Sequence, residues 1–298
     1  MKTHKQYLVE ILMIQKIEST LSRDLIGILW GGFLNGKTIQ SQYDFNLNLP
    51  TLKRIIDFVS DNILFEEKAE DLIKLPLGKY AEQLVATFFN HSKQHHLLGN
   101  NIQLISQNKT IGEVDFLLEN QKTKTNIHLE FAIKFYLKTT ENGAVEYLGP
   151  NAKDSLARKL KKMHEHQLQL LQKHQQLLPL GFQKIIFHPK LLMKVYSFFP
   201  FEEWKKRDKN FATEGWWLKF KDWESLVEVA SYFQFINDKK QWIFPYSSQN
   251  KMQDIPESKV YLNKFFSKDR NYVMVIRWDT NKKIVDRGFI VRNEWPKI

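Results

Sequence analysis

The segment from Asn126 to Tyr136 constrains the fold more than any other part of the chain. Its odd positions are all apolar, whereas its even positions are His128, Glu130, Ala132, Lys134 and Tyr136. Because side chains alternate between the two faces of a β-strand, one set packs and the other points toward a different environment. The pattern predicts a strand on which Glu130 and Lys134 share a face.

The segments around this strand predict an alternating helix and strand core. An apolar stripe predicts a helix over Gly78–Phe89, and the next segments predict strands over Ile102–Ser106 and Gly112–Leu118 with hairpin connections at 107–109 and 120–125. After a break at Leu148-Gly149-Pro150, Asn151 and Asp154 have capping-box spacing and are expected to open a long helix to about Gln175. Further strands are expected over Lys184–Phe187 and Met193–Phe198.

The flanking regions predict more structure but carry no obvious chemistry. Helices are expected over Tyr7–Ile17, Leu21–Leu29, Thr51–Val59 (with Thr51 as a cap) and Trp223–Phe235, and strands over Tyr272–Trp278 and Gly288–Val291. The predicted organisation is a helical N-terminal extension over 1–74, a core over 75–199 and a C-terminal α+β elaboration over 200–298. The last region is either separate or packed on the core as one domain.

Composition bounds the class of protein. The formal net charge is +11, from 44 basic and 33 acidic residues, which suggests a polyanionic partner such as nucleic acid or, less often, an anionic membrane surface. Simple solubility with a basic bias is the alternative. The absence of cysteine excludes disulfides, thiolate zinc sites and cysteine nucleophiles. Without a secretory signal or a membrane-length apolar run, we expect a soluble cytoplasmic protein with no membrane partner.

Three acidic residues lie in elements that could converge. Asp115 and Glu130 fall on neighbouring predicted strands, and Glu82 falls on the preceding helix. Magnesium and manganese prefer hard oxygen ligands, so two or three carboxylates would suffice to hold Mg²⁺ or Mn²⁺. The alternative is that Asp115 and Glu130 are ordinary surface carboxylates and that Glu82 is a salt-bridge partner. Glu113 shares a face with Asp115 and either assists it or, as the preferred interpretation, is a solvated rim residue.

A cation beside these acids is harder to place. Lys134 could stabilise developing charge on a phosphate, but it lies four residues from Glu130, ~13 Å along a strand. Lys134 would have to reach back or a bulge would have to shorten the path. A lysine two residues from Glu130 would lie nearer, but Ala132 occupies that position. Lys159 on the following helix is an alternative source of positive charge.

The predicted helix after residue 151 is rich in basic side chains. It either presents an ordinary solvated face or a surface that contacts phosphates. The candidate nucleic-acid contacts are Arg158, Lys159, Lys162, His166 and Gln167. The Trp216-Trp217 pair either stacks on bases or packs in the core.

Several motifs resemble one bacterial family. They are Pro76-Leu77-Gly78-Lys79-Tyr80-Ala81-Glu82, Gly112-Glu113-Val114-Asp115, His128-Leu129-Glu130-Phe131-Ala132-Ile133-Lys134, Leu148-Gly149-Pro150-Asn151-Ala152-Lys153-Asp154, Glu165-His166-Gln167-Leu168, Glu214-Gly215-Trp216-Trp217 and Arg287-Gly288-Phe289. Together they resemble the family known as domain of unknown function 1853, over nearly the whole chain. That family is similar to the PD-(D/E)xK nuclease superfamily.

The resemblance implies an α/β fold with a restriction-endonuclease-like αβββαβ core and a mixed central sheet. It also implies that Asp115 and Glu130 match the acidic motif positions and that Glu82 matches the acid of the first core helix. The departure is Ala132 at the expected lysine. The leading hypothesis is a metal-dependent nuclease that hydrolyses phosphodiester bonds in DNA, with Glu82, Asp115, Glu130 and Lys134 as catalytic residues. The alternatives are a nucleic-acid-binding module without catalysis and a protein-interaction module; oligomeric state stays open.

Overall fold

The computed structural model describes residues 13–14, 17, 19–30, 43–45, 47, 52–62, 69–141, 143–207, 214–228, 230–244 and 251–297. These residues form two compact units, each made of separate stretches of chain. The first comprises Ile17–Ile133 and Arg158–Lys194 and is called the Glu130 unit. The second comprises Met1–Lys16, Lys134–Ala157 and Val195–Ile298 and is called the Asp286 unit. The contiguous division at residues 74 and 199 stays a prediction.

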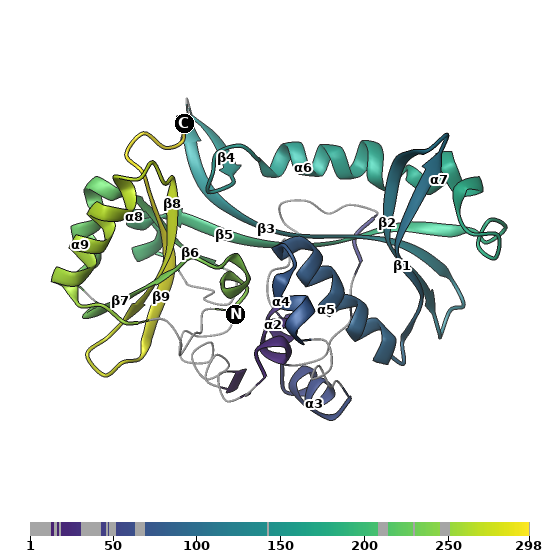
Figure 1. The fold of residues 1–298 in the computed structure, drawn as a ribbon, viewed down its shortest axis with the longest axis horizontal. Helices are drawn as coiled ribbons and strands as arrows, with labels where there is room; N and C mark the ends of the chain where they lie inside the picture. The colour runs from purple at the N-terminus through teal and green to yellow at the C-terminus, as the bar shows by residue number, and fades with distance from the viewer. Residues whose placement is uncertain are drawn as a thin grey trace. The chain divides into compact units, whose positions relative to one another are not determined.

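The Glu130 unit begins with helices and continues into strands (Figure 1). Its elements are α2 (Thr20–Trp30), α3 (Leu52–Asn62), α4 (Ala69–Lys74), α5 (Leu77–His91), β1 (His95–Ser106), β2 (Lys109–Asn120), the first part of β3 (Asn126–Glu141), most of α6 (Leu156–Lys162), a π-helical turn (Met163–Gln167), α7 (Leu170–His174), a 3-10 turn (Gln175–Leu177) and the first part of β5 (Phe187–Pro200). Its strand order is β1-β2-β3-β5, with β1–β2 and β2–β3 antiparallel.

The Asp286 unit contains the remaining parts of β3 and β5 together with the later elements. These are β4 (Ala144–Leu148), α8 (Phe201–Lys205), β6 (Glu214–Lys219), a 3-10 helix (Phe220–Leu226), β7 (Tyr232–Ile236), a 3-10 turn (Lys239–Trp242), α9 (Ile255–Phe266), β8 (Tyr272–Trp278) and β9 (Ile284–Val291). The order β5-β6-β9-β8-β7 combines parallel pairs (β5–β6 and β6–β9) with antiparallel pairs (β9–β8 and β8–β7). The protein is thus a mixed α/β protein with a large mixed sheet.

Apolar packing holds α5 against the strands of the Glu130 unit. The predicted helix is confirmed, and its buried stripe includes Leu84, Phe88 and Phe89. The ring of Phe89 meets that of Phe116 on β2 edge to face, with 5.6 Å between centroids. Tyr80, also buried, donates a hydrogen bond of 2.6 Å from its hydroxyl to Asp24 on α2. Helix α5 is therefore fixed between α2 and the sheet, which sets the position of its polar face.

Glycine permits a close approach at two positions, and at the second of them there is no room for a side chain. At Gly112 on β2, an added Cβ would lie 2.7 Å from a methyl carbon of Leu170 on α7. At Gly288 on β9, it would lie 2.1 Å from the ring of Trp216 on β6. Because real Cβ atoms do not approach this closely, these positions allow α7 and Trp216 to pack against neighbouring strands.

Several predicted boundaries were wrong, and each has a local cause. The helix expected from Asn151 begins at Leu156, because Ala152 adopts a φ of 55° and Gly149 N donates to Asp154 O in a closed turn. The same helix does not run unbroken to Gln175, since the π-helical turn interrupts it. In the segment Lys184–Phe187 only Phe187 is a strand residue, the first of β5, and the three residues before it are turn, bend and irregular backbone.

The largest misassignment is Trp223–Phe235. It was predicted as a helix but contains part of a 3-10 helix followed by β7. By contrast, other predicted segments are confirmed, most of them with longer bounds, namely α2, α3, β2, β3, β8 and β9. Most of Tyr7–Ile17 and the cap Thr51 lie outside the described residues. Within the described part of the chain, no helix combines the length and apolar character that crossing a bilayer would require.

Candidate metal centre

The acidic residues of the Glu130 unit gather where β2 and β3 stop pairing. The β2–β3 ladder ends at Phe116 and Leu129, and one more step in that register places Asp115 opposite Glu130. Beyond this point the amide of Phe131 donates to the Asp115 carboxylate at 2.8 Å. A side chain thus takes the place of the next ladder bond, and the carboxylate is fixed at the fork between the strands.

Three carboxylates converge at this fork. Ligand oxygens from Glu82 on α5 and from Glu113 and Asp115 on β2 all lie within 4.8 Å of one another. Glu113 and Asp115 are two residues apart on one strand and therefore point to the same side. The shared face of Glu113 and Asp115 is predicted from the sequence, which favours a solvated rim residue over an assisting one; the structure places Glu113 in the acidic group.

Glu130 lies beside this group with no exposed surface. Its Oε1 is 2.8 Å from His128 Nε2, and its Oε2 accepts a 2.9 Å hydrogen bond from Gln167 Nε2. Lys159 Nζ donates to Gln167 Oε1 at 3.3 Å, so a chain of polar contacts runs from α6 to Glu130. Gln167 belongs to the π-helical turn, a conformation that is rare and frequent at functional sites.

Lys79 supplies positive charge that the sequence analysis did not assign. It precedes Glu82 by one helical turn, and its Nζ lies 2.7 Å from Glu82 Oε2. It also pairs with the carboxylate of Glu113 and donates to Asn101 Oδ1 on β1 at 3.1 Å. The spacing of three residues between Lys79 and Glu82 on a predicted helix was the available signal.

The electrostatics of the cluster favour an added cation. Burial raises the pKa of Asp115 to about 8, and the negative charges of Glu130 and Glu82 act in the same direction. Burial also raises the pKa of Glu82, against the lowering effect of Lys79. For Lys79, burial lowers the pKa, but its bonds to Glu113 and Glu82 outweigh that effect and raise it to about 12. Without a metal, Asp115 therefore keeps its proton at neutral pH, and a divalent cation at these oxygens would favour the ionised carboxylates.

The donor set fits a hard divalent cation. Every candidate ligand is a carboxylate oxygen, the type that Mg²⁺ and Mn²⁺ prefer. The ammonium of Lys79 already lies against two of these carboxylates, so a cation can approach them. Glu82, Glu113 and Asp115 would hold the ion, and Glu130 would add charge next to Asp115.

The other predicted site residues lie in different surroundings. Lys134 belongs to the Asp286 unit, where its Nζ forms an ion pair of 2.7 Å with Asp154. In the Glu130 unit, Arg158, Lys162 and His166 are exposed, whereas Lys159 and Gln167 are half-buried. The structure thus links Lys159 and Gln167 to Glu130 through hydrogen bonds, and the nucleic-acid assignments stay predictions.

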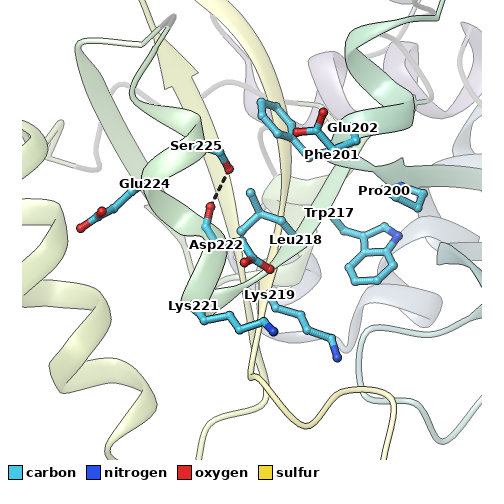
Figure 2. A pocket seen from close by; sticks show the side chains of 10 residues that line it. All are labelled: Pro200, Phe201, Glu202, Trp217, Leu218, Lys219, Lys221, Asp222, Glu224 and Ser225. Atoms are coloured by element: carbon cyan, nitrogen blue, oxygen red, sulfur yellow. Dashed lines mark hydrogen bonds between the residues drawn. The ribbon is translucent and has the colours of Figure 1, made fainter.

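The Asp286 unit contains a pocket of about 610 Å³ (Figure 2). Figure 2 shows Trp217 and Lys219 reaching toward one side of it. Trp216 is fully buried and donates to Asp286 at 2.7 Å, so it is a core residue. The charged residues that line the pocket are of both signs, namely Lys219, Lys221, Glu202, Asp222 and Glu224. This mixture does not select one class of ligand.

Comparison with known proteins assigns the chain to a family. A search of curated proteins and a search of solved structures each found no match. One family model matches residues 52–291, which is most of the sequence and includes every acidic residue of the site. The chain belongs to the family described as Domain of unknown function (DUF1853).

Proposed function

We propose that this protein is a metal-dependent phosphodiesterase that hydrolyses nucleic acid, with DNA as the leading substrate. The observation that carries the proposal is the convergence of Glu82, Glu113 and Asp115 within 4.8 Å at a strand fork. A divalent cation held there would polarise a phosphoryl oxygen and lower the pKa of an attacking water. Perturbed carboxyl pKa values in such a cluster are typical of functional sites.

The protein residues have distinct roles in this proposal. Glu82, Glu113 and Asp115 bind Mg²⁺ or Mn²⁺, and the amide of Phe131 fixes the orientation of Asp115. Glu130 is held by His128 and Gln167, so its charge stays beside Asp115 in a position to orient a water. Such preorganisation is the main protein contribution to metal-assisted hydrolysis.

The order of elements supports a restriction-endonuclease-like core. Helix α5, strands β1, β2 and β3, helix α6 and strand β5 follow the pattern αβββαβ, with β4 as an addition between β3 and α6. The acids come from the first helix and from the second and third strands of this series. We therefore propose the αβββαβ core as the finer description of the Glu130 unit and the adjoining strands.

The charge of the chain supports a nucleic-acid substrate. The net charge is +11, and the exposed side chains of Arg158, Lys162 and His166 follow the strand that contains Glu130. Exposed basic side chains attract and position phosphates.

The proposal is tested with purified protein, Mn²⁺ and plasmid DNA. We expect calorimetry to detect Mn²⁺ binding, and gels to detect metal-dependent cleavage. The variant Asp115→Asn should lose both, because it removes a ligand while its amide oxygen can still accept from Phe131. Glu146→Gln is the matched control, since Glu146 is an exposed strand carboxylate on β4. Unchanged cleavage by Asp115→Asn would reject the assignment.

A nucleic-acid-binding module without catalysis is the second candidate. The observation that favours it is the pairing of Lys134 with Asp154, together with buried Ala132 at the motif position of the lysine. This alternative predicts binding to DNA that weakens steeply with salt and yields no metal-dependent product. The same cleavage and calorimetry experiments, repeated over a salt series, separate the two candidates.

A further inference from the structure

Lys79 lies against the acidic cluster, where its ammonium group pairs with more than one candidate metal ligand. It contacts carboxylates from two different elements, Glu82 on its own helix and Glu113 on β2. Asn101 on β1 provides a third, neutral acceptor at 3.1 Å. These three contacts use the three donors of one ammonium group, so Lys79 connects α5, β1 and β2.

The lysine is both anchored and able to move. Its backbone belongs to α5, which is fixed by buried Tyr80 and Leu84. Its side chain is 42% exposed, unlike Glu82, whose side chain is 13% exposed. Lysine carries a compact point charge on a flexible four-carbon stem. Its ammonium can therefore leave the carboxylates without disturbing the helix.

The ammonium and a divalent cation would compete for the same oxygens. Glu82 and Glu113 are candidate ligands, and both already pair with Lys79. A divalent ion at those oxygens would repel the neighbouring ammonium, since like charges a few ångströms apart oppose each other strongly at a partly buried site. The released ammonium would remain tethered within reach of a phosphate bound to the metal.

We propose that Lys79 is the catalytic cation of this site: it balances Glu82 and Glu113 in the resting protein and contacts the phosphate of the substrate once a divalent ion has bound. The inference rests on the proposed function and names the residue that takes the role left open by Ala132. The positive charge thus comes from helix α5 and not from strand β3.

The variant Lys79→Met tests both halves of the proposal in the full-length protein. Because a competing cation is removed, Mn²⁺ should bind about threefold or more tightly in calorimetry. Because a cation is lost from the reacting phosphate, cleavage at saturating Mn²⁺ should fall about 100-fold. A merely structural role would weaken both. Lys79→Arg keeps the charge and should restore wild-type Mn²⁺ affinity and part of the cleavage rate.

Lys109→Met is the matched control, since Lys109 is an exposed lysine on β2 in the same unit. It should leave Mn²⁺ affinity and cleavage unchanged. Cleavage by Lys79→Met at the wild-type rate, or Mn²⁺ affinity that is unchanged or weaker, would overturn the role of Lys79 while leaving the metal site intact. A wild-type protein that neither binds Mn²⁺ nor cleaves DNA would instead overturn the proposed function, and the role of Lys79 with it.

Discussion

Asp286 and Asp115 are both buried carboxylates, yet their surroundings differ in charge. Asp286 accepts hydrogen bonds from Arg277 Nε and Nη2, each at 2.7 Å, and from the indoles of Trp204 and Trp216. Asp115 accepts one backbone hydrogen bond and lies near the negative charges of other acids. The first group is complete by itself, which is typical of a structural cluster. The second has the single ammonium of Lys79 beside several carboxylates, and such perturbed groups are typical of functional sites.

The largest expected effect is on stability at the complete cluster. Asp286→Ala would leave the buried guanidinium of Arg277 without its carboxylate and two indoles without an acceptor. We expect a loss of about 3–5 kcal/mol in the free energy of unfolding, because an uncompensated buried charge is costly. Urea denaturation followed by tryptophan fluorescence measures this loss. A variant as stable as wild type would show that the Asp286 cluster is dispensable for stability. The proposed difference between Asp286 and Asp115 would then be wrong.

Substitution of Asp115 should instead raise the free energy of unfolding at high pH. The folded pKa of Asp115 is about 8, against an ordinary value of 3.8. Its contribution to stability is therefore complete below pH 3.8 and is lost as the pH rises toward 8. Asp115→Asn cannot ionise, so without metal it should be more stable than wild type at pH 8.5, by on the order of 1–3 kcal/mol.

Denaturation of Asp115→Asn at several pH values measures this gain. The difference from wild type should shrink as the pH falls toward 4, and added Mn²⁺ should stabilise wild type but not the variant. Curves that run parallel at all pH values would mean that Asp115 carries no unusual charge penalty.

The smallest expected effect concerns an exposed pair. Lys134 and Asp154 are each about one-third exposed in their ion pair, so solvent screens their attraction. Lys134→Met should change the free energy of unfolding by about 0.5 kcal/mol or less. Thermal unfolding detects a larger change if the pair is more important than its exposure suggests. Cleavage by the same variant sharpens the comparison of lysines: a loss equal to that of Lys79→Met would favour Lys134.

The sequence predicted elements where local patterns and packing agree. The period-two alternation of β3 and the apolar stripe of α5 both specify which face is buried, and both elements formed. The predictions were wrong where a turn displaced the start of a helix, or where the spacing of apolar residues fitted more than one kind of element. The closed turn at Gly149–Asp154 delays α6, and the apolar residues of Trp223–Phe235 fit a 3-10 helix followed by a strand as well as they fit a helix.

The sequence predicted which acidic residues form the candidate site, but it did not predict which basic residue pairs with them. Glu82, Asp115 and Glu130 were identified from element order, and the structure brings the first two together with Glu113. The sequence predicts that Glu113 shares a face with Asp115, and the spacing of Lys79 from Glu82 was an available signal. That Lys79 meets Glu113 depends on how α5 lies against β2, which no local pattern specifies. The contact of Gln167 with Glu130 depends on the π-helical turn, which no sequence pattern predicts.

The position of β9 in the strand order has a consequence for synthesis of the chain. β9 lies between β6 and β8, although both of those strands precede it in the chain. In a nascent polypeptide that has emerged from the ribosome only as far as β8, the antiparallel pair of β7 and β8 therefore has no partner strand on the β8 edge. That edge and the free side of β6 stay open to aggregation or chaperone capture until β9 arrives and joins them.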